Sequence, residues 1–147
     1  MERIKLEFPE HAWRHVHTLS VRVGDMNYAQ HLGHDTLISL LQEARAAALA
    51  TLGTSELNIG GFHGVVAELA VQYQAEAHWP DVIEVTTAIP VPAGKGLKVF
   101  HRMVRRGDQR QVATAMLTML LVDPSQGGKV VPLPESFLSQ LASGEFA

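Results

Sequence analysis

The 147-residue chain contains no cysteine. This absence excludes a disulfide-stapled scaffold, a thiolate zinc site and a cysteine nucleophile. The chain also lacks an excess of positive charge, because 12 Lys and Arg residues stand against 15 Asp and Glu. A dedicated nucleic-acid-binding protein usually carries a clear basic surplus, so we expect no nucleic-acid partner.

Long apolar runs are missing as well. The most apolar stretch, residues 116–122, is far shorter than the roughly 20 residues that a membrane-spanning helix requires. Charged side chains interrupt residues 1–17, which therefore lack the apolar centre of a signal peptide. We expect a cytoplasmic protein with no membrane segment.

Several catalytic signatures are also absent. There is no Gly-x-Ser-x-Gly nucleophile elbow, and residues 94–96 (GKG) lack the spacing of a phosphate-binding loop. His31, His34 and Asp35 lie close in sequence, but no further ligand follows at a spacing typical of a metal site. We therefore expect neither a serine hydrolase nor a bound metal.

The remaining composition is that of a folded domain, with 46% hydrophobic and 18% charged residues. A chain of this length buries roughly 70% of its unfolded surface in one core, which is enough without covalent staples. We expect a single domain over residues 1–147, with its core at about 15–134.

Residues 35–52 are predicted to form a long helix. Asp35 is the expected N-cap and Gly53 the left-handed stop. The polar side chains in its middle share one narrow face: Ser39, Gln42 and Glu43. Because nearly all other positions are apolar, the helix is expected to be buried on most sides.

The other elements are mainly strands. Apolar residues alternate with polar ones in residues 62–77 and, in part, in residues 15–23. Three further strands are predicted over residues 82–91, 97–106 and 111–123. The last of these is apolar on both faces, which favours an interior position. A short helix is predicted over residues 134–141. Short connections indicate an antiparallel sheet, so we expect an α+β fold in which a curved sheet wraps one central helix.

Three motifs in order carry a family resemblance: residues 21–27 (VRVGDMN), 31–34 (HLGH) and 43–45 (EAR). Together with residues 64–73, 81–85 and 122–134, they resemble the hotdog-fold acyl-CoA thioesterases of the 4-hydroxybenzoyl-CoA thioesterase type. The resemblance implies a hotdog fold and hydrolysis of an acyl-CoA substrate. It also implies no cofactor beyond the coenzyme A of the substrate. A half-wrapped sheet needs a second copy to close it, so we expect a homodimer or homotetramer.

The chain departs from this family at the predicted helix N-terminus. Gln30 stands where glycine is usual, Gly33 and His34 stand where two asparagines are usual, and Leu37 stands where tyrosine is common. These positions surround the expected place of the thioester, so the acyl group is not predicted.

The resemblance implies that Asp25 is the catalytic carboxylate, either as nucleophile or as general base. Taken without the family, Asp25 would be read as a turn residue. His31 lies six residues later and is expected to orient Asp25 or the turn. Glu43 is an alternative base. We favour the interpretation that it instead forms a structural ion pair with an arginine across a dimer interface.

Backbone N–H groups at the start of the helix are expected to hold the developing oxyanion, through Gly33 or His34. Asn27 and Tyr28 are second-tier candidates for binding the substrate, although Asn27 also suits a simple turn. A basic hairpin is the candidate contact for the phosphates of coenzyme A, through Lys95, Lys98 and Arg102.

Two other functions remain open. A hotdog-type enoyl-CoA hydratase is one, because residues 24–27 (GDMN) resemble the opening of its Gly-Asp-x-Asn-Pro motif. The proline is absent here, and His31 comes one position too late. The other is a domain that binds an acyl-CoA or acyl carrier without turnover.

Overall fold

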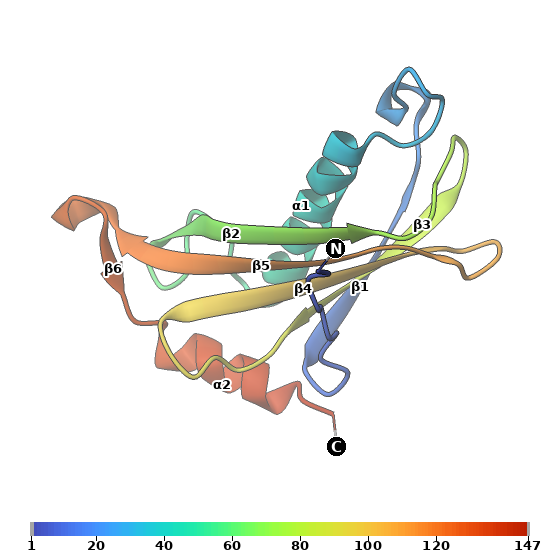
Figure 1. Ribbon diagram of the computed structural model, residues 1–147. Helices are drawn as coiled ribbons and strands as arrows, with labels where there is room; N and C mark the ends of the chain where they lie inside the picture. The colour runs from blue at the N-terminus through green and yellow to red at the C-terminus, as the bar shows by residue number, and fades with distance from the viewer. Residues whose placement is uncertain (1, 147) are drawn as a thin grey trace.

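The computed structural model describes residues 2–146, which fold into a bent antiparallel sheet with one long helix across it (Figure 1). In chain order the elements are β1 (Trp13–Ser20), α1 (His34–Thr51), β2 (His63–Tyr73), β3 (Val82–Ile89), β4 (Gly96–Arg105), β5 (Gln111–Asp123), β6 (Lys129–Val131) and α2 (Glu135–Ser143). Among these residues, no helix is long and apolar enough to cross a membrane.

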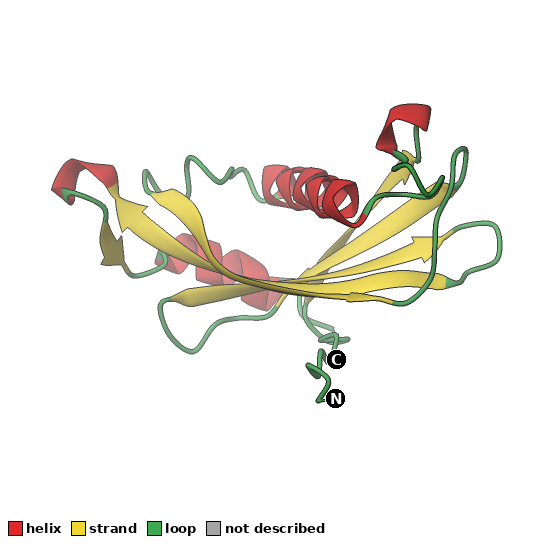
Figure 2. Ribbon diagram, turned by 45° about the horizontal axis from the view of Figure 1, so that its top comes forward, coloured by secondary structure: helices red, strands yellow, loops and turns green. Residues whose placement is uncertain are grey.

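The strands follow the order β1-β3-β4-β5-β2, and β6 pairs with the end of β5. All these pairings are antiparallel. Helix α1 lies across the concave face of the sheet, while both chain termini lie beyond its convex face (Figure 2). The predicted α+β hotdog architecture is confirmed, as is the interior position of β5.

Helix α1 is one residue longer at its start than predicted. The N-cap residue is Gly33. Its backbone is extended, and as a glycine it has no side chain that could cap the helix. The prediction of Asp35 as N-cap is wrong, because Asp35 lies inside the first turn, where its negative charge suits the helix dipole. Gly53 ends the helix as predicted, with φ +71. Its N–H bonds to the Ala50 carbonyl while the Thr54 N–H reaches back to Leu49.

Strand β2 differs most from the sequence-based expectation. It ends at Tyr73, four residues before the predicted end, and a bulge interrupts its pairing with β5 between Val66 and Glu68. The extra residue shifts the alternation, so that Val66, and not Val65, shares the concave face with Leu69. Residues 74–77 form an irregular segment that runs past the start of α1.

Smaller differences affect the ends of other strands. Strand β1 spans Trp13–Ser20 and not residues 15–23, because Val23–Asp25 turn into a short 3₁₀ helix. Strand β6 was not predicted, and with three residues it is too short to show a period. The terminal helix predicted over residues 134–141 is present as α2.

Candidate active site

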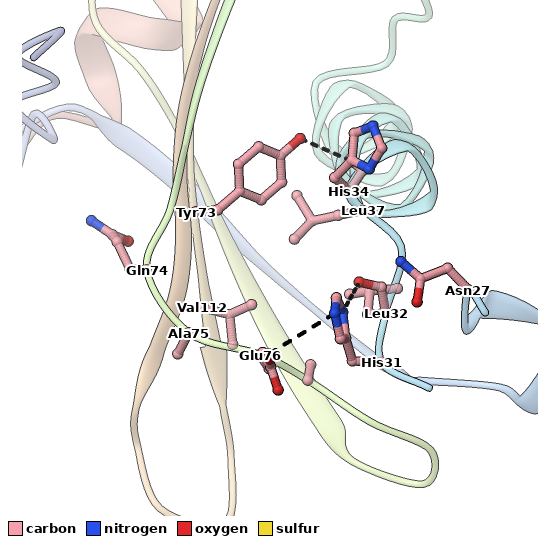
Figure 3. Close-up of a pocket in the computed structure, with 11 residues that line it drawn as sticks. Asn27, His31, Leu32, His34, Leu37, Tyr73, Gln74, Ala75, Glu76 and Val112 are labelled. Carbon is pink, nitrogen blue, oxygen red and sulfur yellow. Dashed lines mark hydrogen bonds and ion pairs between the residues drawn. The ribbon is translucent and has the colours of Figure 1, made fainter. Parts of the chain in front are cut away.

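A pocket of about 380 Å³ lies where the loop before α1 meets the segment that follows β2 (Figure 3). Of the predicted site residues, Asn27, His31 and His34 line it together. Tyr73, Gln74 and Glu76 supply polar lining from the opposite side. The site is therefore built from two segments that are far apart in the sequence.

The N-terminus of α1 offers unpaired hydrogen-bond donors at this pocket. The N–H of Gly33 is already used, because it donates to the Asp25 carbonyl at 3.2 Å. Within the described residues, nothing accepts a hydrogen bond from the N–H groups of His34, Asp35 or Thr36. These groups and the positive end of the helix dipole favour a negatively charged oxygen. Of the two predicted oxyanion donors, only His34 is free.

His31 presents one ring nitrogen to the pocket. Its Nδ1 lies 3.1 Å from the carbonyl oxygen of Leu32, a contact that requires the proton to be on Nδ1. The lone pair of the neutral ring is then on Nε2, which lies 3.9 Å from Oε1 of Glu76. Figure 3 shows His31 and Glu76 approaching one another across the pocket. An imidazole held in this way can accept a proton from a bound water.

Glu76 was missed by sequence reasoning. It follows the end of β2, and its second oxygen lies 3.6 Å from Nε2 of His78. No motif or spacing distinguishes Glu76 from the other glutamates of the chain. Its place opposite His31 arises only from the packing of the β2–β3 connection against the loop before α1.

Asn27 lies beside the cap of α1. Its side-chain oxygen accepts a hydrogen bond from the Ala29 N–H at 3.0 Å, the turn interaction that the sequence suggested. The amide nitrogen remains as a donor next to Gly33. Tyr28 does not share this position, because its side chain is fully exposed and lies outside the pocket lining.

Asp25 is not part of the pocket lining. Its side chain is only 3% exposed, and its carboxylate accepts hydrogen bonds from the Arg22 backbone N–H at 2.8 Å and from the Arg22 guanidinium at 3.1 Å. The hydrogen bond from Arg22 lowers the pKa of Asp25, although burial opposes this effect. In this arrangement Asp25 shapes the turn before α1, and its catalytic role stays a prediction.

The other predicted site residues lie apart from the pocket. Glu43 is paired with His17 of the same chain, with 2.6 Å between Oε2 and Nε2. Lys98 and Arg102 alternate with the buried residues of β4 and so lie on its convex side, where Arg102 pairs with Glu10 at 2.6 Å. Lys95 is in the exposed turn before β4. Within residues 2–146, no three acidic or histidine side chains converge as metal ligands.

Comparison with known proteins gives one family and many similar folds. The sequence profile of the thioesterase-like superfamily matches residues 21–141. No curated protein matches the chain in sequence.

Solved structures resemble the chain over most of its length. A 1,4-dihydroxy-2-naphthoyl-CoA thioesterase from Synechocystis superposes with a TM-score of 0.79 and 17% identity, covering 88% of this chain and 96% of that one. A DHNA-CoA thioesterase from Staphylococcus aureus gives 0.78 and 14%, covering 91% and 97%. The 4-hydroxybenzoyl-CoA thioesterase of a Pseudomonas species gives 0.77 and 16%, covering 87% and 99%. At these identities the likeness shows the hotdog fold.

Proposed function

The chain belongs to the thioesterase-like superfamily, and we propose that it hydrolyses an acyl-CoA thioester to a free acid and coenzyme A at the pocket beside the start of α1. One observation carries the proposal. The pocket is lined both by His34, whose N–H is free at the helix N-terminus, and by His31, whose Nε2 is not used by another hydrogen bond, so that an oxyanion donor and a proton acceptor border the same space.

In the proposed mechanism, the thioester oxygen accepts hydrogen bonds from the N–H of His34 and from the amide of Asn27. Nε2 of His31 takes a proton from a water molecule, whose oxygen attacks the acyl carbon. The tetrahedral intermediate collapses with cleavage of the carbon–sulfur bond, and the leaving thiolate receives the proton from His31. One such oxyanion donor contributes on the order of 3 kcal/mol to lowering the barrier.

Glu76 has a supporting role in this mechanism. The separation of 3.9 Å between its Oε1 and Nε2 of His31 is too long for a direct hydrogen bond. It suits an ion pair that strengthens once His31 carries the extra proton. Glu76 is therefore placed to pair with His31 after the proton transfer, and it does not occupy Nε2 beforehand.

We also propose that two copies of the chain associate through β2. This edge strand exposes several large apolar side chains: Val65, Val66, Leu69 and Tyr73. An uncovered apolar edge strand is a template for pairing with another strand. Tyr73 also lines the pocket, so a second copy at this edge would lie next to the reacting groups. The assembly is proposed to be a homodimer or a homotetramer. The predicted cytoplasmic location is also part of this proposal.

The test uses the lack of cysteine, because a thiol-reactive dye then reports released coenzyme A without background from the protein. We expect the wild type to release coenzyme A from a panel of short, long and aromatic acyl-CoAs. His31→Gln should lower kcat by a hundredfold or more, as for a lost general base. His11→Gln is the control, because His11 is exposed and lies outside this pocket.

Asp25→Asn separates the two candidate catalytic residues. If His31 is the base, Asp25→Asn should keep kcat within about tenfold of the wild type, provided that circular dichroism shows a folded chain. A hundredfold loss in Asp25→Asn with an active His31→Gln would return the role to Asp25. If no acyl-CoA releases coenzyme A, the hydration of crotonyl-CoA then distinguishes a hydratase from a binding domain.

A further inference from the structure

Helix α1 does not cover the sheet evenly. It packs mainly over β1 and β3 and leaves the concave face of β2 largely bare. Leu69 and Tyr73, which both belong to that face, are 44% and 48% exposed. The space between α1 and β2, which we call the groove, is therefore partly open, and the pocket where the thioester is proposed to react lies at its end near the start of α1.

A second cavity, of about 250 Å³, continues this groove away from the helix N-terminus. Leu37 lines the first pocket, and Leu41, one helical turn later, lines the second. On the strand side, Tyr73 lines the first and Leu69 the second. The two cavities share no lining residue, but they lie one after the other along the path between the same two elements.

The far end of this path holds a buried polar group without a partner. The side chain of His101 lines the second cavity and is only 1% exposed. Its Nδ1 lies 2.9 Å from the hydroxyl of Thr87, whereas Nε2 has no hydrogen-bond partner. Buried polar groups are nearly always paired, so Nε2 of His101 is available as a hydrogen-bond partner for a group that enters the second cavity.

The surroundings of His101 keep it neutral. Burial, assisted by the nearby charge of Arg45, lowers the pKa of His101 to about 3. Arg45 does not satisfy the free nitrogen, because its Nε donates to Oε1 of Glu56 at 2.6 Å. The tautomer decides whether Nε2 donates or accepts, and a hydroxyl can serve as partner in either case.

We propose that the acyl group of the substrate lies along this groove and that a hydroxyl at its far end hydrogen-bonds to Nε2 of His101. The inference rests on the proposed thioesterase function. The helix rises by about 10 Å between His34 and Leu41. An extended chain advances about 1.2 Å per bond, so an acyl group of about eight carbons reaches the second cavity. The substrate class is therefore an acyl-CoA of medium length with a terminal hydroxyl.

The experiment compares octanoyl-CoA with 8-hydroxyoctanoyl-CoA by release of coenzyme A. We expect the wild type to prefer the hydroxylated substrate by about fivefold or more in kcat/KM, as for one hydrogen bond formed in a buried site. His101→Leu should abolish or reverse this preference while octanoyl-CoA is still hydrolysed. His101→Gln should retain part of it, and serves if the leucine variant does not fold. His11→Leu, an exposed histidine, should behave as the wild type.

The outcomes separate this inference from the proposed function. Equal kcat/KM values for the two substrates in the wild type would overturn the inference and leave the thioesterase standing. An undiminished preference in His101→Leu, or in His101→Gln if the leucine variant does not fold, would overturn the role of His101. Failure to release coenzyme A from any acyl-CoA would overturn the proposed function itself.

Discussion

Strands β3 and β2 have opposite environments, although both are rich in apolar residues. In β3, Ile83 and Val85 are fully buried beneath the helix. In β2, Val66 and Leu69 face the same side of the sheet but remain partly exposed. The side over β3 is filled by the protein itself, whereas the side over β2 is partly open in the single chain.

This difference separates stability from function within one sheet. Close packing over β3 removes apolar surface from water, which is the main favourable term in folding. The open side gives up part of that gain, and in return it contains both cavities and the edge where a second copy is proposed to bind. Each prediction below changes one side and compares it with the other.

The largest effect is expected for truncation on the closed side. Ile83→Ala should lower the free energy of unfolding by about 2–5 kcal/mol, because it leaves a cavity in a fully packed region. Leu69→Ala should cost much less, since its side chain is already 44% exposed. Urea denaturation of both variants measures the difference. Equal losses would mean that another chain buries Leu69 in solution.

The pH dependence of stability should report the buried His101. Its pKa is about 3 when folded and about 6.5 when unfolded, so between these values only the unfolded chain binds the proton. Stability is therefore complete above about pH 6.5 and is lost as the pH falls. The expected loss from this group is about 2 kcal/mol between pH 7 and pH 5.

His101→Gln should remove this part of the pH dependence when unfolding is followed in urea at both pH values. His63→Gln is the matched control, because it replaces another imidazole of the sheet that is only partly buried. A slope in His101→Gln equal to that of the wild type would contradict the assignment.

Filling the open side should change the substrate range. Leu69→Trp places a large side chain in the groove, so kcat/KM for octanoyl-CoA should fall by about tenfold or more, comparable to the 1.4 kcal/mol that a modest steric clash costs. Acetyl-CoA, which does not reach beyond Tyr73, should be affected little. Val65→Trp is the control on the opposite face of the same strand. A similar loss in both variants would point to damage to β2 itself.

The smallest effect is expected where β2 touches the helix. The hydroxyl of Tyr73 donates to the His34 carbonyl at 2.9 Å and ties the end of β2 to the start of α1. Tyr73→Phe should lower the free energy of unfolding by about 1 kcal/mol. Tyr28→Phe should have no effect, because the Tyr28 side chain is fully exposed. Thermal unfolding of the two variants tests whether the hydrogen bond holds in solution.

Local patterns predicted much of the fold. The apolar run over α1 and the glycine at position 53 determine a buried helix and its end, because both act within a few residues. Alternation predicted strands, and the short connections between them predicted antiparallel pairing. It failed at the bulge near Val66, where one extra residue shifts the register without any signal in composition.

The site was predictable only in part. The turn residues Asn27, His31 and His34 were found from their local motif, and all three line the pocket. That motif did not reveal that Arg22 occupies the Asp25 carboxylate, since a side chain's hydrogen-bond partner depends on where the backbone turns.

The amino-acid order alone determines the elements and the turn that opens α1, because propensity, alternation and capping are local. The meeting of His31 with Glu76, and of His101 with the groove, depends on how β2 and β4 pack relative to α1. Such contacts join residues that are distant along the chain, and they form only when burial of the whole apolar surface selects one arrangement of sheet and helix.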